Sequence, residues 1–349
     1  MFGSVSAIGL LGGAAAHANT TSNIAPKWQL DAPAPSVTFQ SALAAYNDGR
    51  YEEALASAKL AGAKGDTDAQ VLAGTILMNG EASLINDNEA VDWFSRAAAG
   101  NNSDAHLALG KMSMTSRGGL SPQDALIYFT QASKAGRIEA NRAIGEMYMK
   151  GVGVVQDSAK AQVWLKKAAK AGNTDGARKM GDTLIESDPQ AALEWYEKAA
   201  ANGDDEAAYI AAIMYVENYE IRPNSARAAE LLRQAANAGI AGAQADYGLL
   251  VYQGAGVPQS TEDAAIWFEK SARGGDREGQ FLFAFTLAKG EGVTQSYEDA
   301  YYWILRSEKA GASGASDYDE DRQVLKQRLD DNVDSAILDK ARARFKAER

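Results

Sequence analysis

The chain has 349 residues, 35 of them basic and 46 acidic, which gives a formal charge of −11; it contains two histidines and no cysteine. Disulfide scaffolds, thiolate metal sites and cysteine nucleophiles are therefore excluded, and a histidine-based triad or a multi-histidine metal site nearly so. A pI near 4.9 argues against nucleic acid as a partner, whereas 46% hydrophobic and 23% charged residues are typical of a globular protein.

Residues 1–18 have the pattern of an export signal. An uncharged apolar run from Ala7 to Ala16 precedes Ala16-His17-Ala18, which offers small residues where signal peptidase cleaves. The run is too short to span a bilayer, and no other stretch is apolar enough to do so, so we expect no integral membrane segment once the signal is removed. Residues 1–6 lack the usual Lys or Arg. We expect a periplasmic or secreted protein, with a cytoplasmic one as the alternative.

Two further segments precede the main body of the chain. Residues 19–36 hold three of the seven prolines and little apolar periodicity, which predicts a flexible, extended linker. Residues 37–64 come next and contain the stretch AYNDGRYEEALASAKLAG.

From residue 65 to residue 311 the chain repeats one unit about seven times. A marker glycine follows an alanine-rich stretch at intervals of 31–36 residues, and Asn101 fills the one place where it is missing. A small residue stands nine places after each marker, and a large apolar one, usually tryptophan, eight places before the next. These positions, which we expect to pack the units together, include Gly74, Gly110, Gly145, Gly181, Gly248, Trp93, Trp164, Trp195, Trp267 and Trp303.

Each unit contains two helical stretches. In the unit that begins at Gly136, Ala140, Ile144 and Tyr148 share one helix face, Gly151-Val152-Gly153 interrupts the helix, and a second helix is predicted over 158–171. Because one helix pair cannot bury its apolar face alone, the units must stack. The sequence therefore predicts an all-α fold, an α-solenoid.

Units such as GRIEANRAIGEMYMKGVGVVQDSAKAQVWLKKAAKAG resemble Sel1-like repeats, the longer relatives of tetratricopeptide repeats. The resemblance covers residues 65–311 and implies a superhelix of antiparallel helix pairs that acts as an adaptor or scaffold. Residues 37–64 resemble a tetratricopeptide pair more closely and are expected to cap the N-terminal end. The unit at Gly172 is five residues short and lacks the glycine turn, so the superhelix curvature around 184–224 is not predicted.

Residues 312–349 no longer follow the repeat. Leu325, Leu329, Val333 and Ile337 form an apolar stripe at four-residue spacing, which predicts a capping helix, or two short helices divided near Asn332.

The residues that could carry chemistry have simpler interpretations. The Gly-x-Gly segments follow a helix rather than a strand, so they predict a turn and not a phosphate loop. His106 occupies a position where other units carry an amide, which indicates a repeat position. No carboxylate pair is singled out by its spacing, so we predict no catalytic residue, metal ligand or cofactor.

The resemblance also implies a concave binding groove, lined by the sixth, tenth and thirteenth residues after each marker. These residues are charged at the centre of the array and aromatic toward its C-terminal end. The expected partner-binding residues are Arg142, Glu146, Arg178, Asp182, Tyr209, Ile213, Tyr252, Phe281 and Phe285. Two alternatives stay open: a tighter superhelix or the C-terminal helix buries the aromatics, and the charged residues form only i, i+4 helix pairs.

The resulting hypothesis is a non-catalytic scaffold that holds a protein partner in this groove. For an exported protein the resemblance adds cell-envelope signalling or exopolysaccharide regulation as settings. The alternative is a glycan-binding or carboxylate-dependent hydrolytic protein that uses aromatics and acids of the groove.

Overall fold

The structure is a computed structural model that describes residues 37–347 except 83, 218–220 and 311–317. The predicted signal (1–18) and linker (19–36) lie outside the described residues. All regular structure in the described ranges is helical. The first half comprises α1 (Phe39–Asn47), α2 (Tyr51–Ala63), α3 (Thr67–Asn79), α4 (Asp87–Ala99), α5 (Ser103–Met114), α6 (Pro122–Lys134), α7 (Ile138–Lys150), α8 (Ser158–Lys170) and α9 (Thr174–Asp182).

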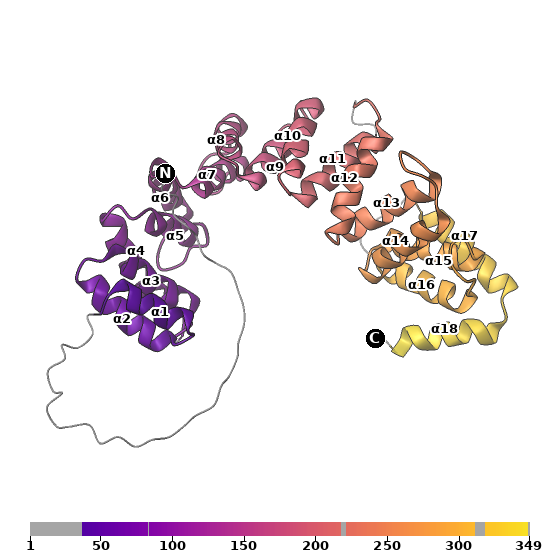
Figure 1. The fold of residues 1–349 in the computed structure, drawn as a ribbon, viewed down its shortest axis with the longest axis horizontal. Helices are drawn as coiled ribbons and strands as arrows, with labels where there is room; N and C mark the ends of the chain where they lie inside the picture. Colours follow the sequence, from indigo (N-terminus) through magenta and orange to yellow (C-terminus); the bar gives the residue numbers. More distant parts are fainter. Residues whose placement is uncertain (1–36, 83, 218–220, 311–317, 348–349) are drawn as a thin grey trace, which may run out of the picture.

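The second half comprises α10 (Pro189–Ala201), α11 (Asp205–Val216), α12 (Ser225–Asn237), α13 (Ala241–Gln253), α14 (Thr261–Arg273), α15 (Arg277–Lys289), α16 (Tyr297–Ala310), α17 (Asp319–Asn332) and α18 (Ser335–Ala347). From α3 to α16, each odd-numbered helix and the even-numbered helix after it form one unit, whose members we term the first and second helix. Figure 1 shows the units following one another along a curved array. The predicted all-α solenoid is confirmed.

The marker residue ends one helix and lets the next begin almost at once. Gly136 has φ 87°, and Asn101, which replaces the glycine, has φ 59°, a left-handed conformation that asparagine tolerates better than most residues. The following residue often caps the next helix: the side chain of Asp66 accepts the backbone N–H of Ala69 at 3.0 Å, and Asn102 does the same for Ala105.

The small residue of the first helix packs against the residue that follows the tryptophan position. A Cβ added at Gly110 would lie 2.5 Å from Cε1 of Phe129, and one added at Gly145 would lie 2.6 Å from Cγ of Leu165. The side chains that pack over Gly74, Gly110, Gly145, Gly181 and Gly248 are Phe94, Phe129, Leu165, Tyr196 and Phe268. The close approach therefore depends on this second apolar residue, which the spacing of the repeat did not single out.

The tryptophans lie at the edges of the packed units, each with a cation over its ring. Trp93 and Trp303 are buried, whereas Trp164, Trp195 and Trp267 are half-buried. The cation comes from three residues later in the same helix, and its distance from the ring centroid ranges from 4.0 Å for Lys270 over Trp267 to 5.6 Å for Arg306 over Trp303. Where the ring is absent, at Leu231, the corresponding residue is Gln234.

The glycine turns are structural. Gly153 has φ 70°, and a Cβ there would overlap the carbonyl oxygen of Pro122 at the start of the preceding second helix. In the same turn, the Gln156 amide donates to the carbonyl oxygen of Met149 at 2.9 Å. Gly151, at φ 69°, ends α7 in a left-handed conformation, so both glycines of the segment have a structural role in the turn.

The short unit closes by shortening its first helix. Helix α9 has nine residues, whereas α7 has thirteen, and the chain then turns through a 2.7 Å bond from Asp188 N to the carbonyl oxygen of Leu184 before Pro189 opens α10. Two buried apolar clusters meet here without merging: one contains Met147, and the next begins at Ala169.

The C-terminal segment forms two helices that part at Val333, next to the predicted division at Asn332. Helix α18 packs on α16 through the buried residues Leu338 and Ala341. Helix α17 lies against α15. The ring of Tyr318, the residue before α17, is 5.3 Å from the ring of Phe281 on α15.

Candidate functional site

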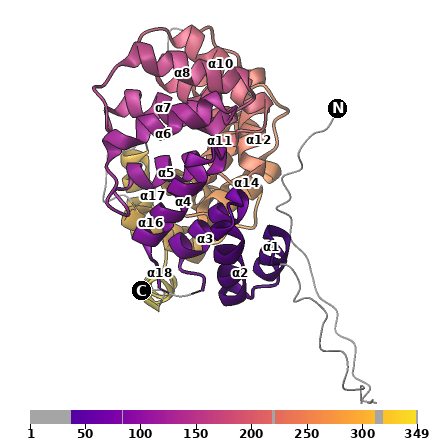
Figure 2. The ribbon, with the colours of Figure 1, turned by 90° about the vertical axis from the view of Figure 1, so that its left-hand side faces the viewer.

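The first helices line the inner side of the array. First helices of neighbouring units contact one another; α7 contacts α9, and α13 contacts α15. Among the described residues, the second helices of neighbouring units, from α2 to α16, do not approach each other as closely. Figure 2 agrees, since α7 and α11 lie nearer the middle of the ring of helices than α8, α10 and α12. This inner side, which we term the concave face, carries the predicted partner-binding residues.

At the centre of the concave face, charged side chains form a network that joins three units. Arg142 pairs with Glu146 on its own helix and, at 3.2 Å, with Asp175 on α9. Arg178 pairs with Asp175 at 2.9 Å and with Asp204, at the start of α11, at 3.1 Å. We term these five residues the charged ladder. Its members do more than form i, i+4 pairs, because they connect neighbouring units.

Asp182 does not belong to the charged ladder. Its carboxylate accepts the hydroxyl of Tyr196 on α10 at 2.8 Å, whereas the ion pairs of Arg178 go to other carboxylates. The pairing of Arg178 with Asp182 is therefore wrong. Arg178 and Asp182 lie one helical turn apart, but the Tyr196 ring packs over Gly181 and brings its hydroxyl to Asp182 instead.

Farther along the concave face, a phenol and a carboxylate join α11 to α13. The Tyr209 hydroxyl donates to Asp246 at 2.9 Å. Burial, together with repulsion from Asp276, Glu217 and Glu278, raises the pKa of Asp246 to about 6 and outweighs this hydrogen bond, which lowers it. Sequence reasoning found Tyr209 but missed Asp246. The signal was present, since Asp246 is the one charged residue in the helix AGAQADYGLLVYQ.

At the C-terminal end of the concave face, the predicted aromatics differ in accessibility. Phe281 is only 4% exposed, because Tyr318 covers its ring and the Arg322 guanidinium lies 5.6 Å from its centroid. The expectation that Phe281 is an accessible binding residue is therefore wrong, and the C-terminal helix is the cause. Tyr252 and Phe285 remain half-buried, as does Ile213.

Tyr252 and Phe285 border a cavity of about 310 Å³ between α13, α15 and α17, which we term the terminal pocket. Its wall is mostly apolar. The Tyr252 hydroxyl donates a 2.5 Å hydrogen bond to Glu291, and the Lys289 ammonium lies 4.3 Å from the Phe285 ring centroid. The lining residues are Leu249, Tyr252, Phe268, Phe281, Leu282, Phe285, Tyr318, Asp321, Val324, Leu325 and Arg328.

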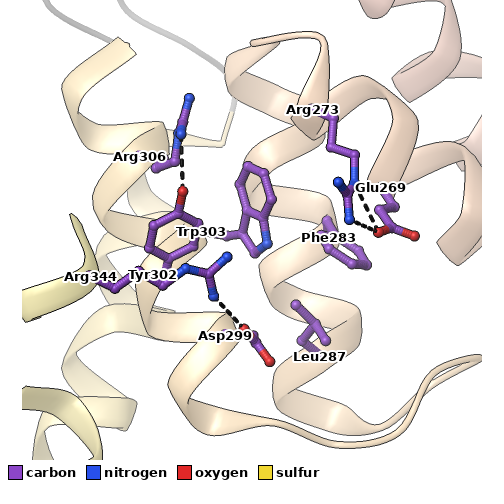
Figure 3. A pocket seen from close by; sticks show the side chains of 9 residues that line it. All are labelled: Glu269, Arg273, Phe283, Leu287, Asp299, Tyr302, Trp303, Arg306 and Arg344. Atoms are coloured by element: carbon purple, nitrogen blue, oxygen red, sulfur yellow. Dashed lines mark hydrogen bonds and ion pairs between the residues drawn. The ribbon is translucent and has the colours of Figure 1, made fainter. Parts of the chain in front are cut away.

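A second cavity, of about 520 Å³, lies where α14, α15, α16 and α18 meet. Figure 3 shows its arginines around the Trp303 indole, with Arg273 bonded to Glu269 and Arg344 to Asp299. The Arg344 guanidinium lies 3.8 Å from the Tyr302 ring centroid. These contacts hold α18 on the last unit, so this cavity belongs to the C-terminal cap.

His106 occupies an amide position of the repeat, but its ring is half-buried and its buried Nδ1 has no hydrogen-bond partner among the described residues. Other units place a buried amide there, such as that of Gln70, which donates to the carbonyl oxygen of Gly62 at 2.7 Å. Burial lowers the pKa of His106, which favours the neutral ring. In the described part of the chain, no three His, Asp or Glu side chains are grouped to hold a metal ion, and no helix is long and apolar enough to cross a membrane.

One solved structure resembles the chain over most of its length. The chain is similar to a Sel1 repeat protein from Oxalobacter formigenes, with 26% identity, a TM-score of 0.66 and coverage of 83% of this chain and 85% of that one. The antigen c5321 of uropathogenic Escherichia coli gives 21% identity and a TM-score of 0.37 over 87% and 82% of the two chains. The immunity protein Pa5087 of Pseudomonas aeruginosa gives 16% and 0.34 over 66% and 83%. Among curated proteins, none matches significantly.

The family model for the Sel1 repeat matches more than half of the chain. The matched residues are 67–102, 103–136, 138–173, 177–204, 205–240, 241–276 and 278–311. These seven matches follow the helix pairs from α3 to α16, the short unit included. The chain belongs to the Sel1 repeat family, whose members generally mediate protein–protein interaction.

Proposed function

We propose that this chain is a non-catalytic scaffold that holds a protein partner on its concave face. One observation carries the proposal. The repeated residues pack the units together, whereas the concave face has large, half-buried side chains that differ from unit to unit. Ile213, Tyr252 and Phe285 are examples. Apolar and aromatic anchors in a concave surface are typical of sites that recognise peptides and helices.

We also propose that the protein works outside the cytoplasm, in the cell envelope. The support comes from the apolar run and small residues of residues 1–18. Mass spectrometry of the protein isolated from its native cells tests this, because export predicts a mature chain that begins near Asn19. A chain in the cytoplasm that retains residues 1–18 would contradict it.

The glycan-binding or hydrolytic alternative has weaker support. Sugar stacking needs an open ring face, but Lys or Arg lies over each of the five tryptophans of the repeats, as in Trp267. Acid–base hydrolysis needs a second carboxylate beside Asp246, but Asp276 accepts the backbone N–H of Gly279 at 2.7 Å and the Ser271 hydroxyl at 3.2 Å. Asp276 thus has a structural role at the start of α15.

Photo-crosslinking in intact cells tests the scaffold. A benzoylphenylalanine at Ile213 or Phe285 would report contacts of the concave face, and the same group at Val163, which is 66% exposed on the second helix α8, is the matched control. We expect protein adducts from the concave positions and few from Val163. Equal adducts from both faces, or adducts from Val163 alone, would contradict the concave face as the binding surface.

A further inference from the structure

We propose that the terminal pocket anchors a basic amphipathic segment of the partner. A large apolar side chain of that segment enters the pocket, and a Lys or Arg one helical turn away reaches the carboxylates beside it. This inference rests on the proposed scaffold function and specifies the chemistry of the partner.

The pocket has the size and lining of an anchor site. A volume of about 310 Å³ is at the lower end of ligand pockets, which suits one large side chain rather than a whole small molecule. Leu249, Phe285 and Leu325 supply apolar wall from three helices, and Val324 at the rim is 41% exposed. Burying an aromatic or Leu side chain there would contribute directly to affinity.

The side of the pocket toward the middle of the array is acidic. Asp246 lies one turn before Leu249 on α13, and Glu278 lies one turn before Leu282 on α15. Glu217 and Asp276 lie near enough to Asp246 to raise its pKa by repulsion. Several cations are close by as well. Arg277 and Arg322 both pair with Asp319 at 2.5 Å, Lys289 pairs with Glu291 at 3.2 Å, and Arg328 lines the pocket together with Asp321. The surface beside the pocket therefore favours a positively charged ligand.

Arg322 of α17 shows how a cation can pack against an aromatic ring of the terminal pocket. The guanidinium of Arg322 lies over the ring of Phe281, bonded at the same time to Asp319 and, at 2.7 Å, to the Ser307 hydroxyl. An arginine or lysine of the partner would make the same kind of contact one turn farther into the concave face, with Glu278 and Asp246 in place of Asp319.

The test measures binding of two fluorescein-labelled helical peptides to the full chain by fluorescence anisotropy at neutral pH. Both have tryptophan and leucine on one face; one carries lysines one turn from the tryptophan, and the other carries glutamates there. We expect the lysine peptide to bind at least about tenfold more tightly. Val324→Trp should fill the pocket and weaken its binding about tenfold or more, and Glu278→Gln should weaken it about threefold.

Matched controls separate the pocket from general charge attraction. Val155→Trp makes the same change in a loop valine that is 88% exposed, and Glu194→Gln removes one charge from α10. Neither should change binding. Phe285→Ala opens the pocket wall without blocking it and should also weaken binding, which covers the case in which Val324→Trp disturbs α17.

Equal binding of both peptides, or full binding to both pocket variants, would overturn the inference. The proposed function fails on a different result, namely the loss of concave-face crosslinks in cells. If those crosslinks persist in the Val324→Trp variant while the peptide data are negative, the scaffold stands and the basic anchor does not.

Discussion

The hydroxyl of Tyr209 on α11 and the carboxylate of Asp246 on α13 form a 2.9 Å hydrogen bond that joins two units across the concave face. Among the residues that surround Asp246, the other charges that affect its pKa most are Asp276, Glu217 and Glu278, all of them acidic. Asp246 therefore remains partly protonated at a pH where an exposed aspartate is fully ionised.

This pair predicts an unusual pH dependence of stability. The pKa of Asp246 is about 6 in the folded chain against 3.8 ordinarily, so the folded state binds the proton more tightly. Its contribution to the free energy of unfolding is greatest below pH 4 and is lost as the pH rises to about 6. Asp246→Asn should raise stability by about 1–2 kcal/mol above pH 7 relative to the wild type and change it little at low pH.

Urea unfolding at low and neutral pH measures this difference. Asp321→Asn on α17 is the control, because Asp321 is exposed and a similar change of charge there should leave the pH profile as it is. An Asp246→Asn profile parallel to that of the wild type would show that Asp246 titrates normally.

Gly110→Ala should destabilise the array, because the new methyl group would lie 2.5 Å from the Phe129 ring. Overpacking of this kind costs about 1–3 kcal/mol. Phe129→Leu in the same chain should recover part of the loss, since units with alanine at this position, at Ala212 and Ala284, have Leu232 and Ile304 opposite the place of Phe129. Thermal unfolding compares the single and double variants; a double variant no more stable than Gly110→Ala argues against the pairing.

Arg322→Ala should loosen the C-terminal cap. Arg322 is 2% exposed, and its removal takes away the cation beside the Phe281 ring and the hydrogen bond to the Ser307 hydroxyl, at a cost of about 2–4 kcal/mol. Hydrogen exchange should become faster in α15 and α17 and stay unchanged in α3 to α8. The exposed Arg328 on the same helix is the control, and Arg328→Ala should have little effect. Similar exchange in the two variants would refute a special role for Arg322.

Lys270→Gln should cost about 0.5–1 kcal/mol, because Lys270 lies 4.0 Å from the Trp267 ring centroid. A double-mutant cycle with Trp267→Leu isolates the contact. The double variant has the Leu and Gln pair that the chain itself uses at Leu231 and Gln234. If Lys270→Gln costs the same with and without the indole, the cation and the ring do not interact.

The sequence period predicted most of the fold but only part of the site. The spacing of glycines such as Gly145 indicated where helices approach closely, because the same contact recurs in every unit. It did not show that Leu165, rather than Trp164, makes that contact, since both residues repeat together. The repeat period could not predict the burial of Phe281, because α17 follows the last unit and its contact with α15 is not a contact between repeats.

The charged ladder lies where the array has its shortest first helix and where two apolar clusters fail to merge. Several contacts between the units there are partly exposed ion pairs, such as that between Arg178 and Asp204. Dissolved salt screens such pairs far more than it affects buried apolar contacts. Raising the ionic strength should therefore weaken this junction between units more than it weakens the apolar packing on either side.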